Sequence, residues 1–383
     1  MIESDMTKEE KIKLIGRNCQ EILTKADLSH LIESGTPLSH YIGFEISGMV
    51  HLGTGLLTMG KVADFLQAGV KCRVFLADFH SYLNNKLGGD WKNIRWATEN
   101  YFKEAMIASL KCCGVEEKQV EFIMGRDLYE NNISHWETFM EVGQHLTLSR
   151  NLRSISIMGK QQGEDVKMAT LFYPPLQIAD IFTLGVNLAH AGMDQRKAHV
   201  VARQVAKKLK IKPLKDINGK KIAPVAIHNT LIAGLDGPQQ LRGKPQKGEN
   251  DEESLKMSKS RPDSAIFVHD SADEIRQKVR EAYGPPKETE FNPLINWVEK
   301  LVFWGEESGK FEIKRDERYG GKVVYEKLTD LTADYKSGKL FPLDLKNGLA
   351  EWLVEKLAPA REHFDKNPKA KEGLKWMKEF FKK

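Results

Sequence analysis

Residues 41–55 read Tyr41-Ile-Gly-Phe-Glu-Ile-Ser-Gly-Met-Val-His-Leu-Gly-Thr-Gly55 and contain four glycines and one histidine behind an apolar start. A long segment with helical apolar spacing follows, so the stretch predicts a strand that passes into a helix. A tight turn is one interpretation, because glycine adopts positive φ without strain and His51 then lies on the surface. A nucleotide site is the other, because glycines let the backbone approach a phosphate and a helix N-terminus offers free N–H groups. The stretch alone leaves both interpretations open.

Outward from this turn, apolar runs of strand length alternate with amphipathic segments of helix length. The strand-like runs cover 70–80, 120–125 and 223–235, and the helix-like segments cover 54–69 and 195–209. This alternation predicts βαβ units and a parallel sheet with ligand contacts at the carboxyl ends of its strands. We therefore expect an α/β fold, with mostly helical residues at 105–165 between two halves of the sheet. Residues 8–40 are charged and read as helical, without a site signal.

The chain is long enough for two domains, with 383 residues, 41% of them hydrophobic and 29% charged. After Leu235 begins a charged stretch rich in glycine and proline, far longer than a usual connection of about 4–6 residues. Such a stretch is either a linker or a mobile active-site element. A capping box, Ser271 to Glu274, predicts the next helix start. Residues 283–288 resemble a domain boundary, and the remainder is rich in helical patterns apart from 318–328.

Composition also limits the cellular setting. No stretch approaches the ~18 consecutive apolar residues of a membrane span, and the first residues do not form a signal peptide, so we expect a cytoplasmic protein. The cysteines form no CxxC pair, which favours free thiols and argues against structural zinc; they are Cys19, Cys72, Cys112 and Cys113. The net charge is +5, and residues 361–383 carry eight basic against four acidic residues. This basic end indicates either a polyanion partner or a solvated helix.

Two short motifs together carry a family resemblance. His51-Leu-Gly-Thr54 lies at the predicted strand-to-helix turn, and Lys256-Met-Ser-Lys-Ser260 lies in the long charged stretch. In that order, on a split Rossmann-like sheet, they resemble class I aminoacyl-tRNA synthetases. Thr54 stands where the family has a second histidine, and its hydroxyl can still donate one hydrogen bond.

The resemblance implies that an amino-acid carboxylate attacks the α-phosphate of ATP and that pyrophosphate leaves, with Mg²⁺ carried on ATP. Such chemistry requires donors that bind the transition state better than the ground state. The lysine motif would close on the β- and γ-phosphates from the side opposite the histidine turn. The implied ATP-binding and catalytic residues are His51, Gly53, Thr54, Lys256, Ser258 and Lys259.

Four further blocks, at 41–45, 76–84, 173–181 and 191–199, resemble tyrosyl-tRNA synthetases of the archaeal/eukaryotic type over about residues 41–365. The resemblance implies tyrosine, ATP and tRNA(Tyr) as partners and a homodimer built through the inserted helices. The expected organisation is an N-terminal helical extension, a Rossmann-like catalytic domain with a helical insertion, a lysine-motif linking region and a mostly α-helical anticodon-binding domain. Their ranges are 1–40, 41–237 with the insertion at about 105–165, 238–286 and 287–383.

The residues themselves support tyrosine. A phenol hydroxyl in an apolar pocket needs one acceptor and one donor, which Asp180 and Tyr41 supply. Asp180 lies between Ile178 and Ile181 in an apolar run, where an acidic side chain seldom serves only to improve solubility. The resemblance implies that further residues hold the ammonium group or line the pocket. The ammonium residues are Tyr173, Gln177 and Gln195, the floor residues are Gly43 and Glu45, and Ala77, Asp78 and His80 lie where a predicted strand ends at the site. His80 could equally be a structural hydrogen-bonding residue.

For tRNA, the resemblance implies acceptor-stem contacts from Arg153, Arg196 and Lys197, for which ordinary surface charge is the alternative. Tyr319 would stack on the first anticodon base and Asp344 would accept from guanine amines. Phe341 stands where a histidine is common.

Three other functions remain alternatives at this point. A tryptophanyl-tRNA synthetase shares the motifs, but an indole offers one donor and does not need the Tyr41 and Asp180 pair. A catalytically inactive RNA-binding paralogue does not need an intact lysine motif. A small-molecule nucleotidyltransferase does not need the last 100 residues.

Overall fold

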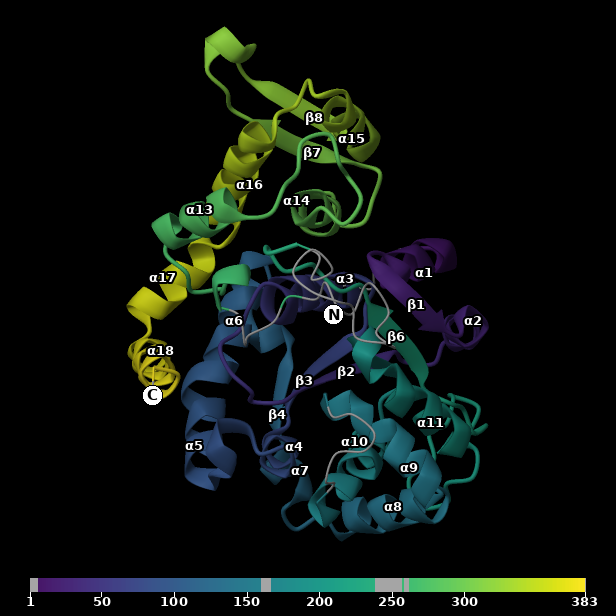
Figure 1. The fold of residues 1–383 in the computed structure, drawn as a ribbon. Helices are drawn as coiled ribbons and strands as arrows, with labels where there is room; N and C mark the ends of the chain where they lie inside the picture. The colour runs from purple at the N-terminus through teal and green to yellow at the C-terminus, as the bar shows by residue number, and fades with distance from the viewer. Residues whose placement is uncertain (1–5, 160–166, 238–256, 258–261, 383) are drawn as a thin grey trace. The chain divides into compact units, whose positions relative to one another are not determined.

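The computed structural model describes residues 6–159, 167–237, 257 and 262–382 (Figure 1). The chain divides into two compact units. The first unit comprises Met1–Gly48, Val62–Lys103 and Glu116–Asn229, and the second comprises Met49–Lys61, Glu104–Val115 and Thr230–Lys383. The domain ranges expected from the sequence remain a prediction.

A six-stranded sheet forms the core of the first unit. Its order is β1-β6-β5-β2-β3-β4, and every pair except β1 with β6 is parallel. The strands are β1 (Cys19–Leu23), β2 (Ser39–Phe44), β3 (Lys71–Leu76), β4 (Glu121–Met124), β5 (Leu188–Gly192) and β6 (Val225–Asn229). From β2 the chain adds β3 and β4 on one side and later β5 and β6 on the other, so the strand order reverses between β2 and β5. In such sheets ligands bind beyond the carboxyl ends of the strands at this switch point.

The expectation of helix throughout residues 8–40 was wrong at β1. This strand pairs antiparallel with β6 at the edge of the sheet, with Glu21 opposite His228. Four of its five residues are partly buried and one is exposed. Because neither face is fully buried, the segment has no two-residue alternation of apolar and polar side chains that would predict a strand.

Helices surround the sheet in the first unit, and Figure 1 shows α8, α9 and α10 close together below it. The expected helix at 195–209 is present as α11, and α1 begins with a capping box formed by Thr7 and Glu10. The helices are α1 (Lys8–Gly16), α2 (Lys25–Glu33), α4 (Asp78–Leu83), α5 (Trp91–Ala97), α7 (Gly125–Tyr129), α8 (Ile133–Gln144), α9 (Leu148–Ser154), α10 (Tyr173–Thr183) and α11 (Arg196–Ala206).

In the described residues of the second unit, helices predominate and there is one hairpin. The strand-to-helix passage after residue 41 is confirmed, since η1 (Gly53–Leu57) runs into α3 (Thr58–Gln67), a helix that begins in the second unit and ends in the first. The hairpin pairs β7 (Ser308–Ile313) with β8 (Val323–Lys327), and α16 packs on β7 through Gly348, where a Cβ would lie 2.8 Å from Ile313. The helices are α6 (Lys103–Cys112), α13 (Ala272–Glu281), α14 (Pro293–Trp297), α15 (Leu328–Ser337), α16 (Pro342–Lys356), α17 (Ala358–Lys366) and α18 (Pro368–Phe380).

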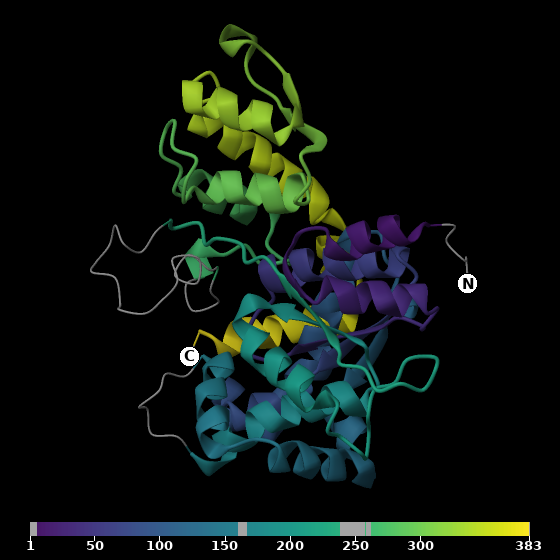
Figure 2. The same cartoon turned by 90° about the vertical axis from the view of Figure 1, so that its right-hand side faces the viewer.

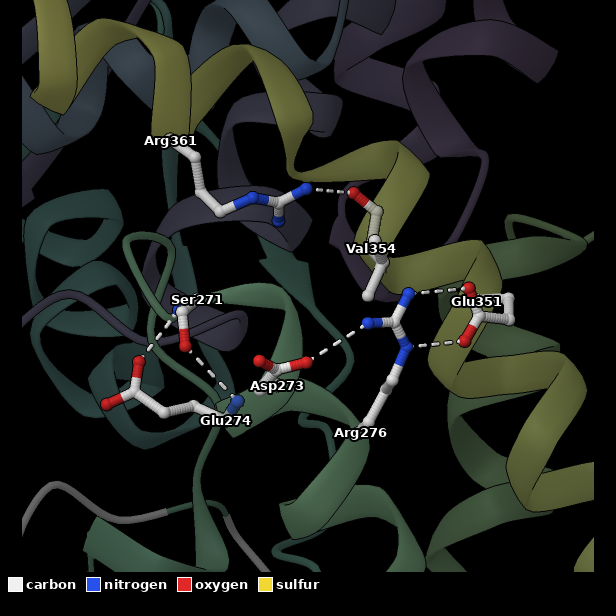
Figure 3. Close-up of polar contacts among 7 residues, drawn as sticks. All are labelled: Ser271, Asp273, Glu274, Arg276, Glu351, Val354 and Arg361. Carbon is white, nitrogen blue, oxygen red and sulfur yellow. Dashed lines mark hydrogen bonds and ion pairs between the residues drawn. The ribbon is translucent and has the colours of Figure 1, made fainter.

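Polar contacts fix α13 beside α16 within the second unit. The capping box at Ser271 and Glu274 is confirmed, with hydrogen bonds of 2.7 and 3.2 Å. Arg276 of α13 donates to both carboxylate oxygens of Glu351 on α16, at 2.7 and 3.0 Å (Figure 3). In Figure 2 the green and yellow helices of this segment again lie side by side.

Among the residues that the structure describes, no helix is long and apolar enough to cross a membrane.

Candidate active site

Asp180 lies at the centre of a buried polar cluster in the first unit. It is fully buried on α10, a helix that prolines in the first turn help to start. Its Oδ1 accepts a hydrogen bond of 2.8 Å from the Tyr129 hydroxyl. Its Oδ2 lies 3.5 Å from His80 Nε2 and has no hydrogen-bond partner among the described residues. One carboxylate oxygen can therefore accept a further donor.

Burial sets the protonation of this cluster. It raises the pKa of Asp180 well above its usual range, and the Tyr129 hydrogen bond lowers that pKa in part. It also lowers the pKa of His80 to about 3, so this imidazole is neutral at pH 7. Because a hydrogen bond to a carboxylate stabilises its charged form, a second hydroxyl donating to Asp180 would favour the ionised acid.

Tyr41 and Gly43 lie on β2, the strand beside the switch point, and face the same side of the sheet because they are two residues apart. Tyr41 is buried, and burial and then the charge of Asp180 raise its pKa. Gly43 is exposed although β2 is a central strand. A Cβ at Gly43 would lie 3.3 Å from the Tyr41 hydroxyl oxygen, so glycine keeps the space beside that hydroxyl open.

The three residues expected to hold an ammonium group are all hydrogen-bonded, Gln177 to Gln195 and Tyr173 to Glu45. Gln177 Nε2 donates to Gln195 Oε1 at 3.2 Å, and Gln195 Nε2 donates to the Ile157 carbonyl at 2.9 Å. Gln177 Oε1 is buried without a partner among the described residues. The Tyr173 hydroxyl is hydrogen-bonded to Glu45; burial and then the Glu45 charge raise its pKa. Amide, phenol and carboxylate oxygens are suitable acceptors for a primary ammonium.

Glu45 and the residues after β3 are the remaining residues expected to line the substrate pocket. Glu45 is held by Asn84 Nδ2 at 2.8 Å and lies 3.5 Å from Lys86 Nζ. After β3, Ala77 is buried and Asp78 accepts the N–H groups of Phe79 and Arg126 at 2.9 and 3.2 Å. Burial raises the pKa of Asp78 to about 6.

His80 lies between Asp180 and Tyr173. Its ring packs edge-on against Tyr173, with centroids 4.7 Å apart, while its Nε2 faces Asp180. Both of its ring nitrogens are buried without a hydrogen-bond partner among the described residues. The structure therefore brings Asp180, His80, Tyr173 and Glu45 into one connected group.

The histidine turn belongs to the second unit. His51 is buried and pairs as a bridge with Phe267, and its Nδ1 accepts the N–H groups of Gly53 and Thr54 at 3.1 and 3.4 Å. His51 therefore caps the helix that starts at Gly53. An Nδ1 that accepts requires the proton on Nε2, which lies 3.2 Å from Thr54 Oγ1. The turn thus presents one N–H donor and one hydroxyl side by side.

The lysine motif lies largely outside the described residues, namely Lys256, Ser258 and Lys259. Met257 is described; it is buried, and its N–H donates to the Ile232 carbonyl at 3.0 Å.

The basic residues expected to contact the acceptor stem differ in their partners. Arg153 is exposed on α9. Lys197 Nζ donates to Ser156 Oγ at 2.8 Å. Arg196 forms a bidentate ion pair with Glu21, at 2.8 and 2.9 Å. The tRNA contacts of these three residues stay a prediction, with ordinary surface charge as the alternative.

The three residues expected at the anticodon lie in the second unit. Tyr319 and Phe341 are 68% and 64% exposed, values that are high for aromatic side chains. Tyr319 ends the short helix η11 (Glu317–Tyr319) in the β7–β8 connection, and Phe341 precedes α16. Asp344 is half-buried in the first turn of α16 and makes no cap hydrogen bond. The anticodon contact of Asp344 therefore stays a prediction.

Sequence reasoning missed Tyr129, the hydrogen-bond partner of Asp180. It lies on α7, directly after β4. The expected strand at 120–125 was the available signal, because residues beyond the carboxyl end of a parallel strand are candidates for the site. Which of those residues turns inward cannot be read from their order alone.

Comparisons with known proteins agree on the family. The model of class I tRNA synthetases (W and Y) matches residues 33–358. A tyrosine–tRNA ligase from Thermococcus sibiricus is 49% identical over 372 residues, which cover 96% of this chain and 98% of that protein. The crystal structure of a tyrosyl-tRNA synthetase complexed with L-tyrosine from Pyrococcus horikoshii has a TM-score of 0.91 at 47% identity, covering 98% of this chain and 100% of that one.

A tryptophanyl-tRNA synthetase from Aeropyrum pernix K1 is also similar in structure, with a TM-score of 0.64. Its identity is 17%, and the match covers 91% of this chain and 84% of that one. This likeness bears on the fold alone.

Proposed function

The chain belongs to the class I tRNA synthetases for tryptophan and tyrosine and ligates tyrosine to tRNA, and we propose that Asp180 is the residue that selects tyrosine. The observation that carries this proposal is the buried carboxylate of Asp180, with Oδ1 bound to Tyr129 and Oδ2 without a partner among the described residues. A tyrosine hydroxyl donating to Oδ2 satisfies that oxygen, whereas phenylalanine leaves it unpaired. An unpaired buried acceptor costs about 1–3 kcal/mol, and more when it is charged.

Tyr41 completes the recognition of the substrate hydroxyl. Burial keeps its phenol protonated, so it can donate to the same oxygen whose proton Asp180 accepts. Gly43 leaves room beside it. At the other end, Tyr173 and Gln177 accept hydrogen bonds from the substrate ammonium, as expected from the sequence. Gln195 was the third expected acceptor, but its Oε1 already accepts from Gln177 Nε2, so in this proposal Gln195 orients Gln177 and the floor residue Glu45 accepts the third N–H group. His80 and Ala77 fill the wall between these ends.

A tryptophan substrate fits this arrangement less well. An indole has one N–H donor and no acceptor, so Tyr41 would have no group to donate to. The buried donor Tyr41 and the buried acceptor Asp180 therefore favour the tyrosine hydroxyl over the tryptophan indole.

ATP is the second substrate, with Mg²⁺ carried on its phosphates. The Nε2–H of His51 and the hydroxyl of Thr54 serve the phosphates as adjacent donors, and Gly53 allows the backbone to approach. Lys256, Ser258 and Lys259 supply charge and donors to the β- and γ-phosphates as pyrophosphate forms. Because the tyrosine carboxylate is itself the nucleophile, these residues act by stabilising charge and form no covalent bond.

Transfer to tRNA uses two sets of residues. Arg153, Arg196 and Lys197 in the first unit contact the acceptor end, where cationic side chains pair with phosphates. Tyr319 stacks on the first anticodon base, Asp344 accepts from guanine amines, and Phe341 adds an apolar wall. The expected domain ranges follow this division, with residues 41–237 catalytic and 287–383 binding the anticodon.

A homodimer through residues 105–165 agrees with exposed apolar side chains on α8 and α9, which belong to the first unit. Ile133 and Met140 on α8 are 71% and 65% exposed, and Leu148 is 63% exposed. Ile133 and Met140 are seven positions apart and so share one face of α8, and contiguous exposed apolar side chains mark interaction surfaces. We place the protein in the cytoplasm, where its substrates are found.

The direct test is aminoacylation of a tRNA(Tyr) transcript by the purified chain with labelled tyrosine, tryptophan or phenylalanine. Charging with tyrosine alone supports the proposed selection. Charging with tryptophan at a similar rate overturns it. Equilibrium sedimentation of the same sample tests the dimer.

A further inference from the structure

Arg196 is held in one orientation by Glu21. Glu21 Oε2 accepts from Arg196 Nε at 2.8 Å, and Oε1 accepts from Nη2 at 2.9 Å. The hydrogen bonds from Arg196 lower the pKa of Glu21, so the carboxylate is ionised at pH 7. A paired fork fixes the plane of the guanidinium, which a single contact would not do. The Arg196 side chain remains 43% exposed, so its N–H groups outside this pair can meet a ligand.

The backbone places Glu21 by an irregular strand pairing. In β1, Glu21 lies opposite His228 of β6, and the register shifts between Cys19 and Glu21. Such a bulge turns the following side chain from the direction that a regular strand would give it. Glu21 Oε2 also accepts from His228 Nδ1 at 3.0 Å.

Two buried histidines support the carboxylate from the interior. Because His228 Nδ1 donates to Glu21, its Nε2 is the acceptor, and it receives a hydrogen bond from His199 Nδ1 at 3.1 Å. The two rings stack with centroids 5.1 Å apart. His199 lies on α11, the helix that begins at Arg196. Glu21 is thus fixed by a buried chain of neutral imidazoles, which a carboxylate serving only for surface charge would not need.

We infer that Glu21 is a positioning residue for the tRNA-dependent step, because it holds the Arg196 guanidinium in the orientation in which its other N–H groups contact the acceptor end of tRNA. This inference rests on the proposed contact between Arg196 and tRNA. Glu21 itself touches no substrate.

Charge and orientation make opposite predictions for Glu21→Gln. The substitution removes a negative charge beside a polyanion-binding residue, so electrostatics alone would lower the KM for tRNA and steepen its dependence on salt. Loss of a fixed guanidinium would instead raise the KM, since a misplaced group no longer meets its partner. A rise in KM with added positive charge is therefore a signature of positioning.

The chain offers a matched control in Asp27→Asn. Asp27 pairs with Arg203, which lies on the same helix as Arg196, at 2.7 Å. The control removes one carboxylate charge from an arginine pair on the same helix, but that pair has a single hydrogen bond and Arg203 has no proposed contact with tRNA. A general loss of stability around α11 would affect both variants alike.

The experiment measures the KM for tRNA in aminoacylation, with tyrosine-dependent ATP–pyrophosphate exchange as the reference for an intact first unit. We expect Glu21→Gln to raise the KM for tRNA about tenfold with exchange changed less than about twofold, and Asp27→Asn to leave both unchanged. In an Arg196→Ala background, Glu21→Gln should have no further effect. An unchanged or lowered KM in Glu21→Gln overturns the inference.

The Arg196→Ala variant separates the two proposals. If it leaves aminoacylation unchanged, the proposed contact of Arg196 with tRNA fails, and the inference about Glu21 fails with it. If Arg196→Ala raises the KM and Glu21→Gln does not, only the inference about Glu21 fails.

Discussion

Tyr129 donates a hydrogen bond of 2.8 Å to Asp180 inside the first unit, where both side chains are buried. The bond fixes one oxygen of the carboxylate, and the other, which has no partner among the described residues, is the one that we propose accepts the tyrosine hydroxyl. It also lowers the pKa of an acid that burial raises, and so favours the ionised form that accepts a phenol proton.

Tyr129→Phe should therefore weaken tyrosine recognition without touching the substrate. Asp180 Oδ1 loses its donor, which costs about 1–3 kcal/mol for an unpaired buried acceptor, and the pKa of Asp180 rises further. We expect kcat/KM for tyrosine in ATP–pyrophosphate exchange to fall about tenfold. Tyr325→Phe is the matched control, because the Tyr325 hydroxyl also donates to a carboxylate, Asp334, but in the second unit. Equal losses in both variants would remove Tyr129 from the site.

The two lysines of the lysine motif should act on the transition state. Lys259→Ala or Lys256→Ala should lower kcat for adenylate formation far more than it raises the Kd of ATP, because charge on the β- and γ-phosphates grows as pyrophosphate leaves. Pre-steady-state adenylate formation at varied ATP separates the two constants. Lys247→Ala, in the same charged stretch, is the control. Equal changes in rate and Kd would make the motif a simple binding element.

Asp344 should matter only after the tyrosine is activated. Asp344→Ala should leave exchange near normal and reduce charging of tRNA with guanosine at the first anticodon position about 10- to 100-fold, the value of a lost bidentate base contact. Discrimination among first-base variants should also flatten. Glu355→Ala removes an exposed carboxylate from the same helix and should change neither. Unchanged charging with unchanged base preference in Asp344→Ala would contradict the anticodon assignment.

Buried neutral histidines should make the protein less stable in acid. Burial, and then the charges of Lys378 and Lys278, lower the pKa of His269 from 6.5 to about 3. Between these values the unfolded chain binds a proton that the folded chain does not, so the free energy of unfolding falls as pH falls, by up to about 1.4 kcal/mol per pH unit. His269→Gln should make this slope shallower between pH 6.5 and pH 4, as measured by chemical denaturation.

Other groups contribute to the same slope without affecting that comparison. Asp78, with its pKa raised to about 6, works in the opposite direction between pH 6 and 3.8, because the folded state holds the proton longer. Asp78 is present in both the unmodified protein and His269→Gln, so the difference between their slopes reports on His269 alone. The exposed His145→Gln serves as control. A slope unchanged by His269→Gln would show that this imidazole is not kept neutral by the fold.

The sequence predicted the parallel sheet and the helix after the histidine turn because both depend on local patterns. The alternation around 70–80 and 195–209 became β3 and α11, and Ser271 and Glu274 formed the expected capping box. Asp180 stood out because an acid in an apolar run needs a partner.

What the sequence did not reveal depends on contacts between distant segments. β1 is a strand because β6 pairs with it, and its own residues lack a strand pattern. Tyr129 and Asp180 are 51 positions apart and meet only because α7 follows β4 and α10 lies in the same unit. Glu21 reaches Arg196 across 175 positions. No local periodicity encodes such pairs.

The most direct test of the account compares tyrosine with phenylalanine in ATP–pyrophosphate exchange, for the unmodified protein and for Asp180→Ala. We predict that the unmodified protein activates tyrosine far better, and that the ratio of the two kcat/KM values falls about 100-fold in Asp180→Ala, because the acceptor for the phenol proton is lost. If Asp180→Ala activates tyrosine at the original rate with the original preference over phenylalanine, Asp180 does not select the amino acid and the pocket assignment is wrong.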